Sequence, residues 1–522
     1  MTKNILFVLF FIAILVCTVV IMIIPDFITD DFLLFYVIRQ NHFLPISLNP
    51  TEHYFLFSRP LTYFFFWLDY NSVWQNPVLY KFHSVLWLLL NIIILYKVIL
   101  EFNKNLTLDT PKIIIFLLLL FYILHPDTLM AIYWISNRNE LISTSFYLLS
   151  LYYFLLFRRI NISKYLIYSS LFFVFSALAK QSAIHLPLIL IILNHMLFQG
   201  NIKESRKATR WFFTFIFSFF CIISVINTIN NGTELYSFIH NAWKKPLAII
   251  GSTLFSMQPY IGNIIFNYFL MHKSIAIIFL VILIAAVLIL YRQNKIPKGK
   301  KLTIIISFTL IYIISFYPRI FVATGRRINS FQIIWIIVLI AFVYNILSEY
   351  KWKKVVLLAI VTLTIANLFT LINDLSNEKK LNSIRENMIE NLRKIYTDNT
   401  FIVVAPDILL IPYQLHYHIY KDFGKAVVHS SSIHYRSVDY SMESHKWEKI
   451  RCLLQDSTYS VYSLEDKIYL DYDTKEEKEI LQLYNSKVGR NGFQKIVARR
   501  PQKFSEMELI YFDGNSWLQI EK

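Results

Sequence analysis

The feature that most constrains this chain is a series of apolar stretches separated by short polar loops. About 20 apolar residues in a helix are enough to cross the hydrocarbon core of a bilayer. Hydropathy predicts eleven such segments: 5–24, 80–100, 112–124, 141–157, 164–180, 183–198, 211–229, 274–291, 302–318, 329–347 and 354–373. Charged residues make up only 16% of the chain, whereas soluble domains carry about 25%. We therefore expect a polytopic α-helical membrane protein with about 11 transmembrane helices.

The basic residues set the expected orientation of these segments. The formal net charge is +17, and the Lys and Arg residues gather in the short loops 158–164, 203–210, 292–301 and 351–354. All of these loops fall on the cytoplasmic side if the N-terminus is cytoplasmic and there are eleven spans. The charge is then explained by topology and by contact with anionic lipid, so no nucleic-acid partner is expected. We expect a multi-pass protein of the bacterial inner membrane, with its C-terminal part on the periplasmic side.

One apolar segment, 244–271, does not fit this count. It contains Pro246, Gly251, Pro259 and Gly262. Counting it as a span would move the basic loop that follows to the wrong side of the membrane. We interpret it as membrane-embedded without crossing, or as a broken helix that lines a cavity. The alternative is a full span paired with a second span that hydropathy misses.

The composition changes after residue 373 and predicts a second domain. Residues 1–373 form the transmembrane domain, with 25–79 as its first outer loop, and 374–522 form a soluble α+β domain. An amphipathic pattern predicts a helix over 377–396. Apolar and β-branched runs predict strands at 400–405, 459–464, 467–472 and 509–512, and Pro406-Asp407 is typical of a helix start.

Two adjacent carboxylates, Asp30 and Asp31, directly follow the first apolar segment. Carboxylates at the mouth of a membrane span are costly to desolvate and face water, a cavity or a partner. They are candidates for the reactive edge of a membrane-embedded enzyme. The alternative is an ordinary solvated loop. Later in the same loop, the aromatic run 63–67 is too short to span and suits a helix lying on the outer leaflet.

The expected topology brings further polar residues to the same outer face. They are Arg59, His83, His125, Arg138, Glu140, Lys180 and Arg326. Cations gathered at one membrane face suit a lipid with a phosphate head, because they stabilise charge that develops on the leaving phosphate. A carboxylate can accept the proton of an attacking hydroxyl.

Each of these residues also has a structural interpretation. Arg and Lys at span ends often snorkel toward the interface. His83 can be a satisfied polar group of a helix, and His125-Pro126 can simply end one. Arg138 and Glu140 can pair with each other.

Four blocks of the chain resemble one known family. H-P-D-T-L-M-A-I-Y-W-I-S-N-R-N-E-L at 125–141 resembles the H-P-x-H-x-E-A-V-x-W-I-S-x-R-x-D/E-L pattern of the transmembrane and tetratricopeptide-repeat protein O-mannosyltransferases. A-L-A-K-Q-S-A-I-H-L-P-L-I-L at 177–190, S-R-P-L-T-Y-F-F-F-W-L-D-Y at 58–70 and F-I-T-D-D-F at 27–32 are similar to three further blocks. The region 242–268 is also similar to the family's block ending in P-x-x-L, and the blocks come in the family's order over about residues 20–340. These enzymes belong to the GT-C superfamily of polyprenyl-phosphate-sugar glycosyltransferases.

The resemblance implies an inverting transfer of a sugar from a polyprenyl-phosphate donor to an acceptor hydroxyl at the non-cytoplasmic face. It implies a catalytic aspartate at Asp30 or Asp31, with Arg59, Arg138 and Lys180 as phosphate contacts or pocket structure. Gln181 replaces the family's acid after Lys180, and no tetratricopeptide repeats follow. The identity of the acceptor therefore cannot be inferred from the family, and it stays open between a protein, a glycan and a lipid.

No cofactor is expected, although a divalent metal stays open. GT-C enzymes with monosaccharide-phosphate donors look metal-independent, and no D-x-D motif or extra acidic cluster among the candidate site residues argues for a metal. Cys17, Cys221 and Cys452 match no metal-ligand spacing. The rival functions are a membrane transporter and a flippase or ligase of lipid-linked glycans. A transporter would place ionisable residues deep inside spans and show inverted repeats.

Overall fold

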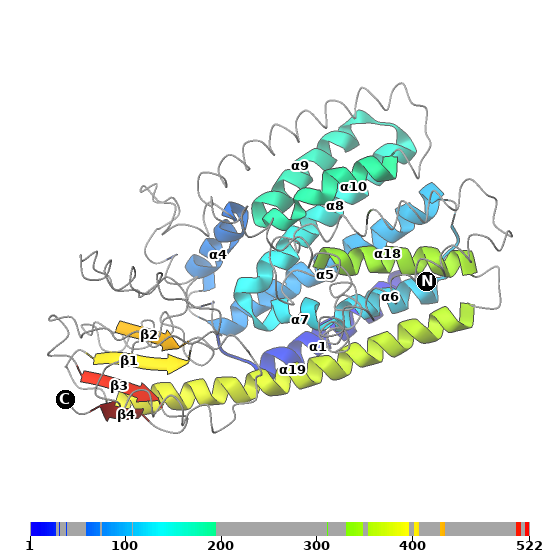
Figure 1. Cartoon of the computed structure of the whole chain (residues 1–522). Coiled ribbons are helices and arrows are strands. Elements are labelled where there is room, and N and C mark those ends of the chain that lie inside the picture. The colour runs from blue at the N-terminus through cyan, green and yellow to red at the C-terminus, as the bar shows by residue number, and fades with distance from the viewer. Residues whose placement is uncertain are drawn as a thin grey trace, which may run out of the picture. The chain divides into compact units, whose positions relative to one another are not determined.

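A computed structural model describes residues 2–27, 31, 38, 59–73, 76–106, 108–194, 311, 330–347, 353–395, 401–406, 429–433, 508–512 and 517–520. These residues are mostly helical (Figure 1). The helices are α1 (Thr2–Ile23), α4 (Pro60–Val73), α5 (Pro77–Leu106), α6 (Lys112–Leu124), α7 (Pro126–Tyr133), η1 (Ile135–Arg138), α8 (Asn139–Ile160), α9 (Ser163–Ala179), η2 (Gln181–His185), α10 (Leu186–Ile192), α18 (Ser330–Leu347) and α19 (Lys353–Ile395).

Four of the described helical segments are long and apolar enough to cross a membrane. They are Asn4–Ile23, Pro77–Leu106, Ile135–Ile160 and Lys353–Lys380. The pair α6 and α7 passes the same test together, with a bend of 47° between the two helices. Helices α9 and α18 are apolar but shorter. Several helices could thus span a bilayer, as a multi-pass membrane protein requires, while the full count of about 11 stays a prediction.

Several predicted segments lie outside the described residues. They are 211–229, 244–271, 274–291 and, apart from Ile311, 302–318. The predicted strands 459–464 and 467–472 and the helix after Pro406 lie outside them as well.

Contacts divide the chain into two compact units. The first unit contains Met1–Asp26 and His42–Leu375, and the second contains Phe27–Asn41 and Ser376–Lys522. Helix α19 runs unbroken from the first unit into the second, although the sequence predicts a span at 354–373 and a separate helix over 377–396. No Pro or Gly occurs between Lys353 and Ile395, so nothing in the sequence interrupts the helix.

Helices α8 and α9 form an antiparallel hairpin held by two serine pairs. The connection turns at Asn161, which adopts the left-handed conformation with φ 57° and ends α8. Ser143 Oγ donates to the carbonyl of Ser176 at 2.9 Å, and Ser176 Oγ donates back to the carbonyl of Ser143 at 2.8 Å. Ser150 and Ser169 repeat this exchange at 2.7 and 2.8 Å. Because the serines recur every seven residues on both helices, they bring the two backbones close along one seam.

Helix α5 packs against the other side of α8 through buried polar groups. Asn91 Nδ2 donates to the carbonyl of Leu141 at 3.1 Å, and Ser145 Oγ donates to Asn91 Oδ1 at 2.6 Å. At the opposite end of the pair, Arg159 Nε donates to Glu101 Oε2 at 2.7 Å. Such interhelical bonds hold helices together where apolar burial alone gives no driving force.

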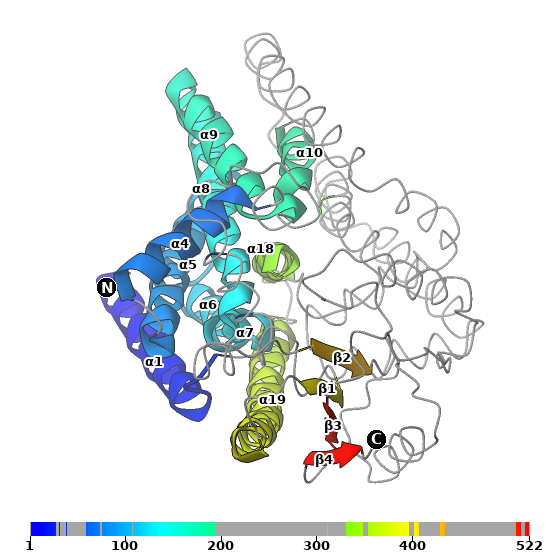
Figure 2. The ribbon, with the colours of Figure 1, turned by 90° about the vertical axis from the view of Figure 1, so that its left-hand side faces the viewer.

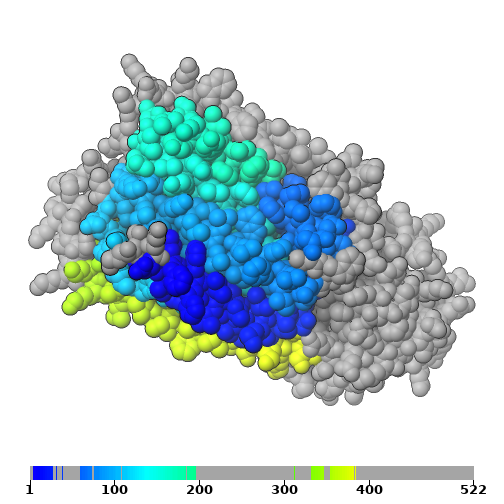
Figure 3. Space-filling view, turned by 180° about the vertical axis from the view of Figure 1, so that it is seen from behind, coloured from blue at the N-terminus to red at the C-terminus, as the bar shows by residue number. Residues whose placement is uncertain are grey.

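Helix α1 is joined to α5 through a buried lysine. Lys81 Nζ donates to the carbonyls of Ile24 and Asp26 at 2.5 and 2.6 Å, and so satisfies acceptors left over where α1 ends. Helix α1, in dark blue, is visible at the surface in Figure 3. Phe7, Phe11 and Met22 of this helix are largely exposed. An exposed stripe of large apolar side chains suits contact with lipid tails.

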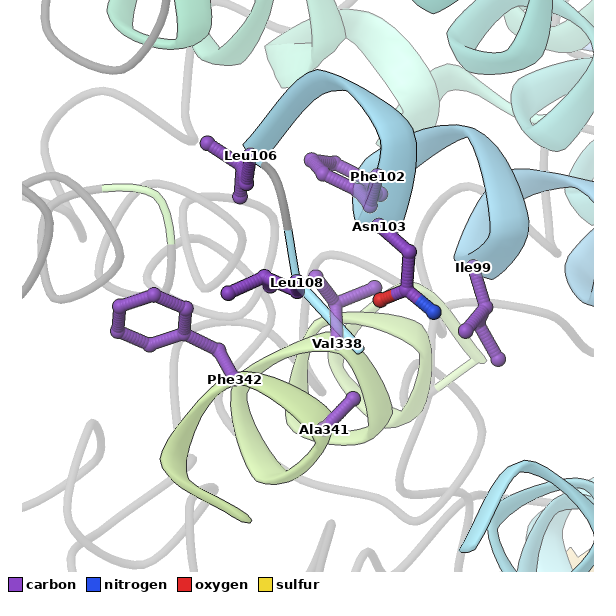
Figure 4. Close-up of a pocket in the computed structure, with 8 residues that line it drawn as sticks. All are labelled: Ile99, Phe102, Asn103, Leu106, Leu108, Val338, Ala341 and Phe342. Carbon is purple, nitrogen blue, oxygen red and sulfur yellow. The ribbon is translucent and has the colours of Figure 1, made fainter. Parts of the chain in front are cut away.

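Helices α6 and α7 lie between α1 and α18 in the interior of the first unit (Figure 2). A small cavity lies between α5 and α18, lined by Ile99, Phe102, Val338 and Phe342 among others (Figure 4). It holds about 10 Å³, which is room for about one water molecule and no more. Its lining is almost wholly apolar, so it is a packing defect rather than a substrate site.

A four-stranded sheet is described in the second unit, in the order β2-β1-β3-β4. The strands are β1 (Phe401–Pro406), β2 (His429–Ile433), β3 (Glu508–Phe512) and β4 (Trp517–Ile520). Strand β1 pairs in parallel with β2 and β3, with Val403 opposite Ser430 and Ile510, and β3 pairs antiparallel with β4. Strands β1 and β3 coincide with the predicted strands 400–405 and 509–512. Most of 374–522 lies outside the described residues, so the α+β domain stays a prediction.

Candidate functional site

The sequence block 125–141 forms a sharp break between α6 and α8. A residue before proline is pushed out of the helical region, and His125 accordingly has φ −69° and ψ 127°, which ends α6 at Leu124. Pro126 then starts α7, and His125 Nδ1 accepts the backbone N–H of Asp127 at 3.2 Å as its N-cap. Trp134 is extended again and leads into the short helix η1. The block thus places non-helical backbone and buried polar side chains inside an apolar body.

Arg138 ends η1 and is fully buried. Its Nε donates to Ser84 Oγ at 2.9 Å, its Nη2 donates to the carbonyl of Tyr80 at 2.8 Å, and its Nη1 donates to Asp69 Oδ2. The guanidinium also stacks over the ring of Phe66, with Cζ 4.9 Å from the ring centroid. Arg138 therefore joins η1, α4 and α5, and its described contacts are all within the protein. The alternative pairing of Arg138 with Glu140 is not what the structure contains.

Asp69 is the only charged residue of the aromatic helix α4. One carboxylate oxygen accepts from Arg138, and the other lies 2.5 Å from His83 Nδ1. Asp69 was not among the residues that the sequence singled out. The available signal was a lone carboxylate in an otherwise apolar helix, which must find a partner when buried.

Helix α4 is held in place by α9 as well. Thr62 Oγ1 donates to the carbonyl of Ala179 at 2.8 Å, at the residue where α9 ends. Burial raises the pKa of Tyr63 to about 12. The predicted aromatic helix at 63–67 is thus part of a longer helix, Pro60–Val73, that carries Asp69.

A second buried ion pair joins α8 to the end of α9. Lys180 Nζ donates to Glu140 Oε1, and both side chains are almost fully buried. Lys180 is extended, with φ −156° and ψ 125°, so α9 ends immediately before it. Lys180 and Glu140 were both predicted as site residues from the sequence, and the structure brings them together.

Unpaired polar atoms surround the start of α8. Within the described part of the chain, Asn137 Nδ2, Asn139 Oδ1, Glu140 Oε2 and Thr144 Oγ1 are buried without a protein hydrogen-bond partner. Glu140 and Thr144 lie one turn apart on the same face of α8. Buried polar groups are nearly always paired, so a group of unpaired donors and acceptors indicates a place for water or a polar ligand.

A buried aromatic cluster connects η2 to α18. His185 Nδ1 lies 2.5 Å from the carbonyl of Ser182, which fixes the proton on Nδ1 and leaves Nε2 to accept from the Tyr147 hydroxyl at 3.3 Å. Trp335 Nε1 in turn donates to the Tyr147 hydroxyl at 2.8 Å. The sequence did not single out these residues. Their role in the described contacts is to fix α18 against α8.

The remaining predicted site residues fall in different parts of the molecule. Asp30 and Arg326 lie outside the described residues. Asp31 is fully buried and belongs to the second unit, whereas Arg138 and Lys180 belong to the first. Arg59 directly precedes α4, and its carbonyl accepts the backbone N–H of Tyr63 at 3.0 Å. A chamber shared by the aspartates and these cations stays a prediction.

Among the described residues, no group of three or more His, Cys, Asp or Glu side chains could hold a metal ion. Comparisons of the chain with protein-family models, with curated proteins and with solved structures found no match.

Proposed function

We propose that the chain is an integral-membrane glycosyltransferase of the GT-C type. It would transfer a sugar from a polyprenyl-phosphate donor to an acceptor hydroxyl at the non-cytoplasmic face of a bacterial inner membrane. The N-terminus is then cytoplasmic, and the C-terminal α+β domain is periplasmic. The acceptor, whether a protein, a glycan or a lipid, stays open.

One observation carries this proposal. The break at His125–Glu140 gathers non-helical backbone, ionised side chains and unpaired polar atoms inside an otherwise apolar helical body. Such groups are expensive in a membrane and persist where they line a cavity or a functional site. This break is also the stretch that carries the longest block of the family resemblance. A sugar, which is rich in hydroxyl groups, can satisfy both the donors and the acceptors that lack partners there.

The proposed reaction needs an attacking hydroxyl, a carboxylate that accepts its proton, and cations beside the leaving phosphate. The acceptor oxygen attacks the anomeric carbon while the bond from that carbon to the phosphate oxygen breaks, which inverts the configuration. Asp30 or Asp31 accepts the proton of the attacking hydroxyl. The lipid phosphate leaves with the electron pair, and cations stabilise its growing charge.

The buried ion pairs assign supporting roles to two of the predicted cations. Arg138 is enclosed by Asp69, Ser84 and Tyr80, so it holds α4, α5 and η1 in register. Lys180 neutralises one oxygen of Glu140 and leaves the other, Oε2, to accept a hydrogen bond from a ligand hydroxyl.

The test is to incubate the purified protein with a panel of undecaprenyl- and dolichyl-phosphate monosaccharides and to measure release of the polyprenyl phosphate. Asp30→Asn and Asp31→Asn are tested one at a time, with Asp109→Asn as the matched control because Asp109 is exposed in the loop after α5. Loss of the general base is expected to slow release by about 100-fold or more. Full activity in both aspartate variants, or no release from any donor by the wild type, would contradict the proposal.

A further inference from the structure

Asp69 contacts two side chains that differ in exposure, Arg138 and His83. The side chain of Arg138 is 1% exposed and that of Asp69 is 9% exposed, whereas the side chain of His83 is 32% exposed. The Nε, Nη1 and Nη2 atoms of Arg138 all donate to protein acceptors. Of the three side chains, only His83 can therefore meet a ligand.

Asp69 determines which atom of His83 is presented. The 2.5 Å contact with Asp69 Oδ1 places a proton on His83 Nδ1, since a carboxylate can only accept. Among the described residues, His83 Nε2 makes no hydrogen bond within the protein, and it is the remaining polar atom of the ring. Arg138 holds the other oxygen of Asp69, so the carboxylate cannot rotate away from His83. Asp69 therefore fixes the orientation of the His83 ring through Nδ1 and leaves Nε2 available to a ligand.

The surroundings of His83 indicate the chemistry of that ligand. Three large apolar residues lie on the same side of α5 as His83. They are Leu79, Phe82 and Leu86, and they are between 42 and 52% exposed. His83 is six residues into α5, so it lies about 9 Å from the start of this candidate span. An apolar surface next to one polar group near a span end suits a lipid whose tail follows the helix and whose head meets the imidazole.

Charge favours an anionic head. The charges of Arg138 and Asp69 cancel each other, so only the imidazolium form of His83 gives the three side chains a net positive charge. In that form Nδ1–H donates to Asp69, and Nε2–H can donate a charge-assisted hydrogen bond to a phosphate oxygen.

We propose that Asp69 is a positioning residue that holds His83 so that its Nε2 binds the phosphate of a polyprenyl phosphate. Arg138 contributes by fixing Asp69 and does not contact the phosphate. The choice of polyprenyl phosphate rests on the proposed function, while the phosphate-binding arrangement rests on the contacts of Asp69, His83 and Arg138.

The experiment measures binding of radiolabelled undecaprenyl phosphate to the full chain in phosphatidylcholine nanodiscs, in parallel with undecaprenol, which lacks the phosphate. The variants are His83→Ala, His83→Gln and Asp69→Asn, with Asp109→Asn as control. His83→Ala is expected to weaken binding of undecaprenyl phosphate by about 10-fold or more and to leave undecaprenol binding unchanged. Asp69→Asn should give a smaller loss with the same preference for the phosphorylated lipid. His83→Gln, which keeps an N–H donor, should retain part of the affinity.

A purely structural role would weaken binding of both lipids equally, and that result would overturn the proposal. Unchanged binding in His83→Ala would overturn it too, and this variant stays informative if Asp69→Asn folds poorly. Inorganic phosphate that competes as well as undecaprenyl phosphate would refute the lipid assignment. Failure of the proposed function is distinguishable, because His83-dependent binding without sugar release would leave this inference standing.

Discussion

Removal of the Asp69 carboxylate tests whether Arg138 is buried as the structure has it. Asp69→Ala leaves the guanidinium of Arg138 in place, fully buried, with the neutral acceptors Ser84 and Tyr80 as its remaining partners. Among the described residues, Asp69 is the only carboxylate paired with Arg138. The variant therefore creates an uncompensated charge in a low-dielectric interior.

Breaking a buried ion pair by removing one partner costs about 3–5 kcal/mol. That loss would lower the ratio of folded to unfolded protein by roughly 100- to 4,000-fold. The double variant Asp69→Leu/Arg138→Met should be more stable than Asp69→Leu alone or Arg138→Met alone, because no unpaired charge is left behind. A double variant that is more stable than the single variants would show that Asp69 and Arg138 are paired, whatever the size of the difference.

The assay follows unfolding in mixed micelles of increasing SDS content through the reactivity of Cys17. This thiol lies in α1 and is 1% exposed, so a maleimide dye reaches it only when the helices separate. Cys221 and Cys452 are first replaced by Ser so that one reporter remains, and Asp109→Asn serves as the control for loss of one negative charge.

Two outcomes would refute the reasoning. A loss of less than about 1 kcal/mol in Asp69→Ala would mean that Arg138 is solvated or paired elsewhere. A double variant whose loss equals the sum of the two single losses would mean that the two side chains are not coupled.

Three further predictions use the same reporter. Lys180→Met should destabilise the protein by about 3 kcal/mol because Glu140 is left charged and buried, and Glu140→Gln/Lys180→Met should recover part of that loss; equal stability of the two variants would argue against the pair. Ser143→Ala and Ser176→Ala should each lower stability by about 0.5–1 kcal/mol, and the double variant should fall short of the sum because the two hydroxyls serve one seam; strict additivity would count against it. Asn161→Gly should be nearly neutral, whereas Asn161→Val should cost about 1–2 kcal/mol through the left-handed φ; two equally stable variants would contradict that conformation.

The sequence by itself determined the features that depend on neighbouring residues. The apolar segments predicted at 80–100, 112–124 and 141–157 are found within α5, α6 and α8, and α1 covers all but the last residue of the segment predicted at 5–24. Their positions follow from local hydropathy, which requires no knowledge of partners. The possible helix end at His125-Pro126 is found for the same kind of reason, since the proline restricts the residue before it.

The sequence pattern gave a wrong helix boundary near residue 375, where no residue marks a helix end. The sequence predicts two helices on either side of residue 375, and the structure contains the single helix α19. The change from apolar to amphipathic composition marks a change of surroundings, and only a helix-breaking residue would have marked an end.

Only the tertiary structure decided which polar groups meet. Arg138 could have paired with Glu140 two residues away, yet it pairs with Asp69, and Glu140 pairs with Lys180. A buried charge takes the partner that helix packing brings within reach, whatever the distance along the chain. The packing of α4 and α5 against η1 brings Asp69 and His83 together beside Arg138. Side-chain composition alone carries no record of that packing.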